Sequence, residues 1–243
     1  MTFTDQLTLP IKVLPKGFPR MLSKGGSLGS NVFDTTSPTS VSFPVSIPAT
    51  LEPFTARFSA KIFSSNFASL LEAVEALIQD PYGCFEQTSS TTYPMVMALQ
   101  FLKAQPDQGN EKVKKMVANI EGKLKKGYEK LVSFKTKEKG YEWFGESPAH
   151  EALSAYGLMQ FAEMKKVTSF VDDGMVKDLT KFILSRRDGN GLFLKNEKAL
   201  DSFGRAPDNI TAAYIVWTLT ESGQADNEDV ATEITFLKQI ADF

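Results

Sequence analysis

Residues 152–161 read ALSAYGLMQF, and 58 positions after Tyr156 a second tyrosine, Tyr214, lies in a similar run, ITAAYIVWTL, at residues 210–219. A third uncharged run, at residues 94–102, lies about one further period upstream. A helix that is apolar on every side is buried on every side. The regular spacing is typical of a repeated helical hairpin, with these three runs as its buried helices.

Other segments are apolar along one face only, which predicts amphipathic helices. The apolar positions are Leu70, Leu71, Val74, Leu77 and Ile78 in one segment, and Val113, Met116, Val117, Ile120, Leu124 and Tyr128 in another. Alternation of amphipathic and fully apolar helices predicts a mainly α fold, an α/α toroid whose hairpins form two concentric layers. We expect about seven helices, which is fewer than a closed ring needs, so the ring is expected to be incomplete.

Residues 1–63 have a different composition, with 7 of the 12 prolines and no helical period. Alternating runs at residues 7–13 and 40–47 predict short β-strands, with the prolines favouring sheet edges. We therefore expect a β-strand segment at residues 1–63 and a helical domain at residues 64–243.

The overall composition excludes several classes of function. A net charge of −2 argues against a nucleic-acid partner, and no run of about 18 apolar residues is present to span a membrane. One cysteine and one histidine cannot build a structural zinc site, so neither a metal nor a cofactor is expected.

The only cysteine lies in the stretch PYGCFEQ, residues 81–87, three positions before Gln87. A tight turn would bring the Cys84 thiolate against the Gln87 side-chain amide, and displacement of ammonia would close an internal thioester. Gly83 provides a backbone that is free to bend, and Pro81 presets the approach of the chain. A lone cysteine is otherwise more often a small buried hydrophobe.

This stretch resembles the thioester signature of the alpha-2-macroglobulin and complement family, in a bacterial-like or invertebrate-like form. The signature places Pro81, Tyr82, Gly83, Phe85 and Glu86 in the thioester turn around Cys84 and Gln87. Further segments follow in the family's order, namely residues 140–145 (GYEWFG), 152–156 (ALSAY), 187–193 (RDGNGLF) and 211–214 (TAAY). The resemblance covers roughly residues 64–243.

The resemblance implies the same α/α toroid, inserted into a CUB-type β-sandwich whose strands would lead from residues 1–63. It implies a single-use covalent trap, not an enzyme, located outside the cell, in the periplasm or at the cell surface. Lysine amines of target proteases or surface proteins would be captured, and the remaining macroglobulin domains would be partners.

Reactivity in this family depends on one position after a Gly-x-Phe turn, where some members carry a histidine that takes over the acyl group. Here the turn is at residues 191–193, and counting forward places Asp201 at the matching position. An aspartate cannot act as that nucleophile in the same way, so we expect a preference for amines. Without the resemblance, Asp201 would be interpreted as a solvated loop carboxylate.

A thioester needs protection from water until it is used. Apolar side chains near the turn could supply it, although each could equally belong to the ordinary core. The candidates for shielding, besides Tyr82 and Phe85 of the turn, are Tyr141, Trp143, Phe144 and Phe203.

Two enzymatic alternatives remain open at this point. Cys84 and His150, the only histidine, could form a cysteine acyltransferase. Paired carboxylates could instead make an α/α toroid hydrolase. His150 stands just before an apolar helix, which favours a helix-capping or surface role for it.

Overall fold

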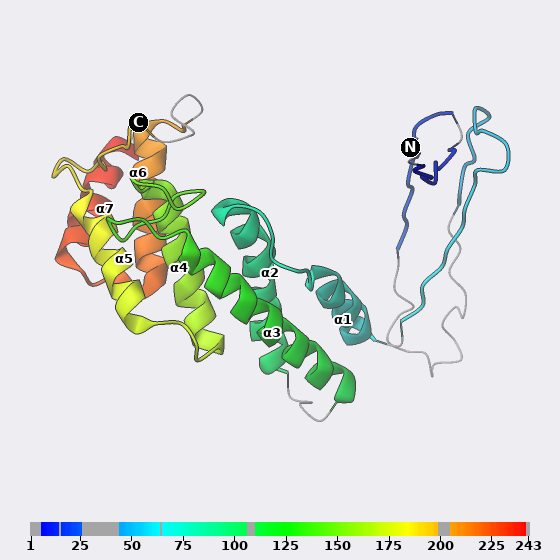
Figure 1. Cartoon of the computed structure of the whole chain (residues 1–243), viewed down its shortest axis with the longest axis horizontal. Coiled ribbons are helices and arrows are strands. Elements are labelled where there is room, and N and C mark those ends of the chain that lie inside the picture. The colour runs from blue at the N-terminus through cyan, green and yellow to red at the C-terminus, as the bar shows by residue number, and fades with distance from the viewer. Residues whose placement is uncertain are drawn as a thin grey trace, which may run out of the picture. The chain divides into compact units, whose positions relative to one another are not determined.

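The computed structural model describes residues 6–14, 16–25, 44–63, 65–105, 110–198 and 205–241. The chain divides into two compact units, Met1–Ile62 and Phe63–Phe243, each of which has its own internal contacts. Figure 1 shows the helices of the second unit and the irregular trace of the first.

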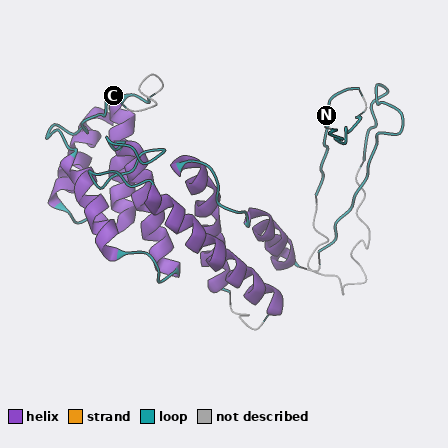
Figure 2. Cartoon of the chain, in the orientation of Figure 1, coloured by secondary structure: helices purple, strands orange, loops and turns teal. Residues whose placement is uncertain are grey.

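The described part of the second unit contains seven α-helices and one short π-helical turn, η1. Their bounds are α1 (Asn66–Leu77), α2 (Phe85–Lys103), α3 (Glu111–Ser133), α4 (Glu151–Val167), α5 (Asp173–Ser185), α6 (Asp208–Leu219), η1 (Thr220–Gln224) and α7 (Glu228–Ala241). Figure 2 shows that helices and loops make up this unit, in agreement with the mainly α class expected from the sequence.

The helices form the two layers predicted from their hydrophobic pattern. Helix α4 packs between α2 and α6, while α3, α5 and α7 pack on α2, α4 and α6 in turn. The inner helices α2, α4 and α6 contain the three runs that are apolar nearly all round. This is the layer order of an α/α toroid, because each helix buried on all sides needs neighbours on both flanks and on its back.

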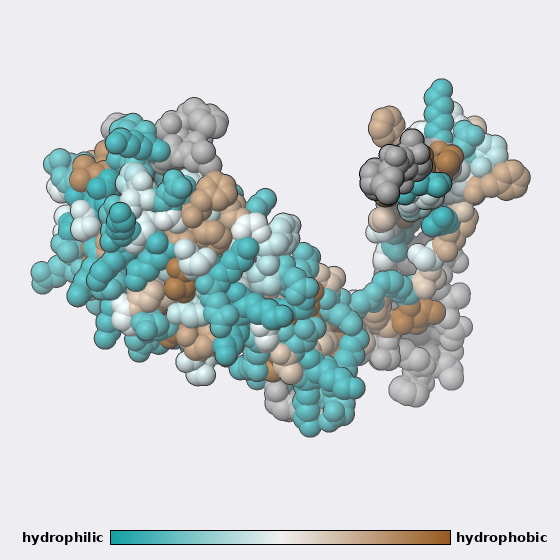
Figure 3. All heavy atoms as spheres, in the orientation of Figure 1, coloured by the Kyte–Doolittle hydropathy of each residue, from teal (hydrophilic) through white to brown (hydrophobic). Residues whose placement is uncertain are grey.

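Helix α3 shows how the amphipathic pattern positions an outer helix. Val113, Ile120 and Leu124 are fully buried against the core, whereas lysines occupy much of the outward face. Figure 3 shows mainly hydrophilic residues over this helix. Asn110 begins α3, because its side-chain oxygen accepts hydrogen bonds from the N–H groups of Lys112 (2.9 Å) and Val113 (3.4 Å).

Helix α1 is less buried than its pattern predicted. Leu71 and Val74 are buried, but Leu70 and Leu77 are 49% and 40% exposed. The reason is that α1 packs mainly against one helix, α2, so only the narrow stripe that faces α2 is covered.

The strand predictions for the first unit are wrong over the residues that the structure describes. Residues 7–13 and 44–47 lie in extended or irregular loops, and the described part of this unit contains no strand. The apolar side chains of Leu7, Leu9 and Ile11 are all largely exposed. A strand is stable only when it pairs with others and buries one face, and the described residues of this unit offer no partner strand. The remaining residues of the predicted run at 40–47 lie outside the described residues. The assignment of residues 1–63 to a β-sandwich thus stays a prediction.

Candidate functional site

The cysteine and the glutamine of the PYGCFEQ stretch lie at the first turn of helix α2. Cys84 is the residue immediately before the helix, and its backbone N–H donates a hydrogen bond to Oε1 of Gln87 at 3.1 Å. The glutamine side chain therefore folds back over the turn onto Cys84. Cys84 is partly exposed and Gln87 is exposed, so the pair is accessible from one side.

Gly83 permits this close approach in two ways. Its φ is +76°, in the left-handed region that favours glycine. A Cβ atom at this position would lie 1.9 Å from Oε1 of Gln87, which is far inside contact distance. Both the backbone conformation and the folded-back Gln87 side chain thus require glycine at position 83.

Helices α2 and α3 hold the turn in place. The hydroxyl of Thr88 donates a hydrogen bond to the carbonyl oxygen of Tyr82 at 3.0 Å. Pro81 packs so closely on α3 that a Cβ atom at Gly127 would lie 3.1 Å from its Cγ. One residue earlier, Asp80 pairs with Lys123 of α3 at 2.6 Å, and this lysine holds the pKa of the Asp80 carboxyl below its usual value. The turn is therefore attached to the outer layer as well as to its own helix.

Phe85 anchors the turn in the core. Its ring is fully buried, 4.9 Å from the ring of Tyr141 and 6.3 Å from that of Phe134. Gly157 of the inner helix α4 admits it, since a Cβ atom there would lie 2.8 Å from the Phe85 ring. A large buried aromatic side chain directly after Cys84 fixes where α2 begins.

The segment 140–145 lies against the same turn. The backbone N–H of Phe85 donates to the carbonyl oxygen of Trp143 at 2.9 Å, and Nε1 of Trp143 donates to Oε2 of Glu86 at 2.9 Å. Among the predicted shielding residues, Tyr141 is fully buried in the core and Trp143 contacts the turn directly, whereas Phe144 is 65% exposed. Phe203 lies outside the described residues, as does Asp201.

His150 caps helix α4, as its position in the sequence suggested. It is buried, and its Nδ1 accepts a hydrogen bond from the N–H of Leu153 at 3.1 Å. A ring nitrogen that accepts a hydrogen bond carries no proton, so the lone pair of Nδ1 is used by this helix cap. The imidazole ring also packs edge-on against Trp143, with the ring centres 5.0 Å apart.

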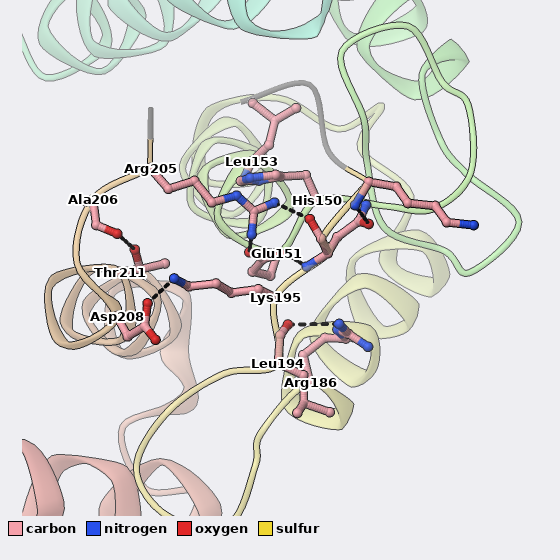
Figure 4. A network of polar contacts seen from close by, with 12 residues as sticks. His150, Glu151, Leu153, Arg186, Leu194, Lys195, Arg205, Ala206, Asp208 and Thr211 are labelled. Atoms are coloured by element: carbon pink, nitrogen blue, oxygen red, sulfur yellow. Dashed lines mark hydrogen bonds and ion pairs between the residues drawn. The ribbon is translucent and has the colours of Figure 1, made fainter. Parts of the chain in front are cut away.

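A buried ion pair next to His150 was not predicted from the sequence. Glu151, 1% exposed, accepts from Nη1 of Arg205 at 3.0 Å and from the backbone N–H of Asn196 at 3.2 Å. Nη2 of Arg205 donates in turn to the carbonyl oxygen of Asn196 at 2.6 Å. Figure 4 shows Arg205 reaching Glu151 beside His150.

This network fastens both ends of the stretch that contains Asp201. Asn196 precedes that stretch and Arg205 follows it, and both bind the carboxylate at the start of α4. The only feature of the sequence that could have indicated this network is Glu151 itself, an acidic residue at the first position of an apolar helix. Such a residue is usually interpreted as a favourable partner of the helix dipole.

The described residues provide neither a metal-binding cluster nor a membrane-spanning helix. No group of three histidine, cysteine or acidic side chains there could hold a metal ion. In the same part of the chain, no helix is both long enough and apolar enough to cross a bilayer.

Comparison with known proteins identifies the family to which most of the chain is similar. The model of the A-macroglobulin TED domain matches residues 57–241. The chain is also similar to alpha-2-macroglobulin-like protein 1 of Mus musculus, with 29% identity over 160 residues. That alignment covers 63% of this chain and 11% of the mouse protein, so the chain spans a small part of this curated relative.

Proposed function

Because this chain belongs to the A-macroglobulin TED domain family, we propose that it carries an internal thioester between Cys84 and Gln87 and uses it once, to capture an amine covalently. One observation carries the proposal: the Gln87 side chain is folded onto Cys84, with Gly83 making room for it. This contact, made by the backbone N–H of Cys84, keeps the Gln87 side chain at the residue that would supply the thiolate, which supports the proposal.

The chemistry needs no cofactor. In the first step the Cys84 thiol gives up its proton and the thiolate attacks Cδ of Gln87; the C–N bond of the amide breaks, and the nitrogen takes up that proton and leaves as ammonia. In the second step an amine attacks the same carbon, the C–S bond breaks, and Cys84 is released as a thiol once the surplus proton of the amine has been passed on. The product is an amide between Gln87 and the target, and because Cys84 does not regain its acyl group, the reaction occurs once per molecule.

The proposed targets are proteases or surface proteins that offer lysine amines, and the proposed partners are further macroglobulin domains. This assignment places the protein outside the cell, in the periplasm or at the cell surface. The assignment of targets rests on the family and on the exposed position of Gln87 at the start of α2.

The test is the intact mass of the protein with and without methylamine. We expect a mass that is lower by one ammonia, then a gain of one methylamine together with one new thiol in a thiol titration. Cys84→Ala should show neither change. His150→Ala should lose at least about 1 kcal/mol of stability with the helix cap but still take up one methylamine per molecule, whereas an acyltransferase that used Cys84 and His150 would lose its reaction. A full mass and a thiol indifferent to methylamine would contradict the proposal.

Asp201 is proposed to set the preference for amines over hydroxyls, since it lies at the position where relatives carry an acyl-accepting histidine. We expect Asp201→His to raise ester formation with glycerol by at least about tenfold, because an imidazole can accept the acyl group and leave the Cys84 thiolate to act as a base. The measurement is the ratio of glycerol to methylamine adducts by mass spectrometry. Asp201→Asn is the matched control and should leave this ratio low, and an unchanged ratio in Asp201→His would reject the assignment.

A further inference from the structure

A hollow of about 370 Å³ opens beside the thioester turn. Its lining residues are Glu86, Ser90, Trp143, His150, Ala152, Leu153, Tyr156 and Tyr214. It lies at the first turns of α2, because Glu86 directly precedes Gln87 in the chain and the hydroxyl of Ser90 donates to the backbone carbonyl of Gln87 at 3.0 Å. The hollow therefore borders the helical turn that carries Gln87, although Gln87 itself is not part of its lining.

The lining combines one carboxylate with neutral aromatic rings. Glu86 is exposed and holds the indole N–H of Trp143 at 2.9 Å. Burial raises the pKa of Tyr156, to which the nearby Glu86 carboxylate also contributes, and burial raises the pKa of Tyr214 to about 12. Both phenols thus stay protonated and uncharged near neutral pH.

Among the residues that the structure describes, no lysine or arginine belongs to this lining. Arg205, the nearest basic residue of the Glu151 network, is paired with that buried carboxylate. The ring of Tyr156 is supported from behind by Tyr93, at 6.0 Å between ring centres. A fixed negative charge beside aromatic faces is an arrangement that attracts an organic cation.

We propose that this hollow, which we call the Glu86 hollow, binds the side-chain ammonium group of the incoming lysine and so selects cationic nucleophiles. This inference rests on the proposed function and deepens it. The ammonium nitrogen would lie near the Glu86 carboxylate, with its methylene groups along Trp143, Tyr156 and Tyr214. Glu86 would position the cation, and loss of one proton from the ammonium to solvent base would then free the amine to attack Gln87.

Binding is tested without the thioester, so that the result does not depend on the proposed reaction. The protein is Cys84→Ala in a Trp217→Phe background, which leaves Trp143 as the only tryptophan of the chain's two. The probe is a lysine amide whose side-chain nitrogen is trimethylated and therefore cannot act as a nucleophile. The neutral control is the same molecule with a carbon atom in place of this side-chain nitrogen. We expect saturable quenching of Trp143 at millimolar concentrations, weakened by salt and at least about threefold tighter for the cation.

Matched variants show which groups are responsible. Tyr214→Leu should weaken the cation about threefold to fivefold, and Tyr214→Phe should not. Glu86→Gln keeps an acceptor for the Trp143 indole but removes the charge, and should weaken the cation about fivefold. If circular dichroism shows that Tyr214→Leu does not fold, the result for Glu86→Gln decides instead, since Glu86 is exposed and its replacement should not disturb the fold. Equal quenching by the neutral control, or quenching that neither variant changes, would overturn the inference even if methylamine uptake is normal.

Discussion

Gly83→Ala is expected to abolish formation of the thioester while the helical unit stays folded. The added methyl group would lie 1.9 Å from Oε1 of Gln87, so the glutamine side chain has to leave Cys84. The positive φ of +76° adds roughly 1–2 kcal/mol of backbone strain. We expect the full, unreacted mass and no methylamine uptake in the assay described above.

Gly189→Ala is the matched control for this prediction. Gly189 has nearly the same φ, +82°, but a Cβ atom there would meet nothing within 4 Å. The two variants should therefore lose similar stability, and only Gly83→Ala should lose the reaction. If Gly83→Ala took up methylamine as the parent protein does, Gln87 would have to reach Cys84 by a geometry other than the one seen here.

Glu151→Ala should destabilise the helical unit by about 3–5 kcal/mol, because it leaves the guanidinium of Arg205 buried without its counter-charge. For a unit of this size that corresponds to a fall in the unfolding temperature of about 10 °C. The measurement is thermal unfolding followed by circular dichroism. Asp178→Ala is the control, since it removes an ion pair of similar length, 2.8 Å to Lys139, that lies at the surface.

The two changes should differ clearly. Asp178→Ala should leave the unfolding temperature almost unchanged, because water screens and replaces a surface pair. Equal unfolding temperatures for both variants would show that the Glu151 network contributes nothing to stability. Glu151→Ala should also remove the shared partner of Asn196 and Arg205, since both bind this carboxylate.

Much of the candidate site could be proposed from the sequence because its geometry is local. Cys84 and Gln87 are three positions apart, which is the spacing at which side chains meet across the first turn of a helix. The requirement for glycine at position 83 follows from the same short turn. The contacts of Trp143 with Glu86 and His150 could not be predicted, because residues 57 and 7 positions away meet only once the loop at 140–145 folds against α2 and α4.

The sequence by itself determined the helical class and the order of the two layers, because a period of 3.6 residues shows which faces of each helix must be buried. It also predicted Cys84 and Gln87 as the candidate reactive pair. Only the tertiary structure decided which apolar runs are covered: residues 7–13 have a strand-like pattern but no partner strand among the described residues, and half of the apolar stripe of α1 remains exposed. Only the tertiary structure also revealed the Glu151–Arg205 pair and the Glu86 hollow. Both bring together residues that are distant in the chain, and such contacts produce no periodic pattern in the sequence.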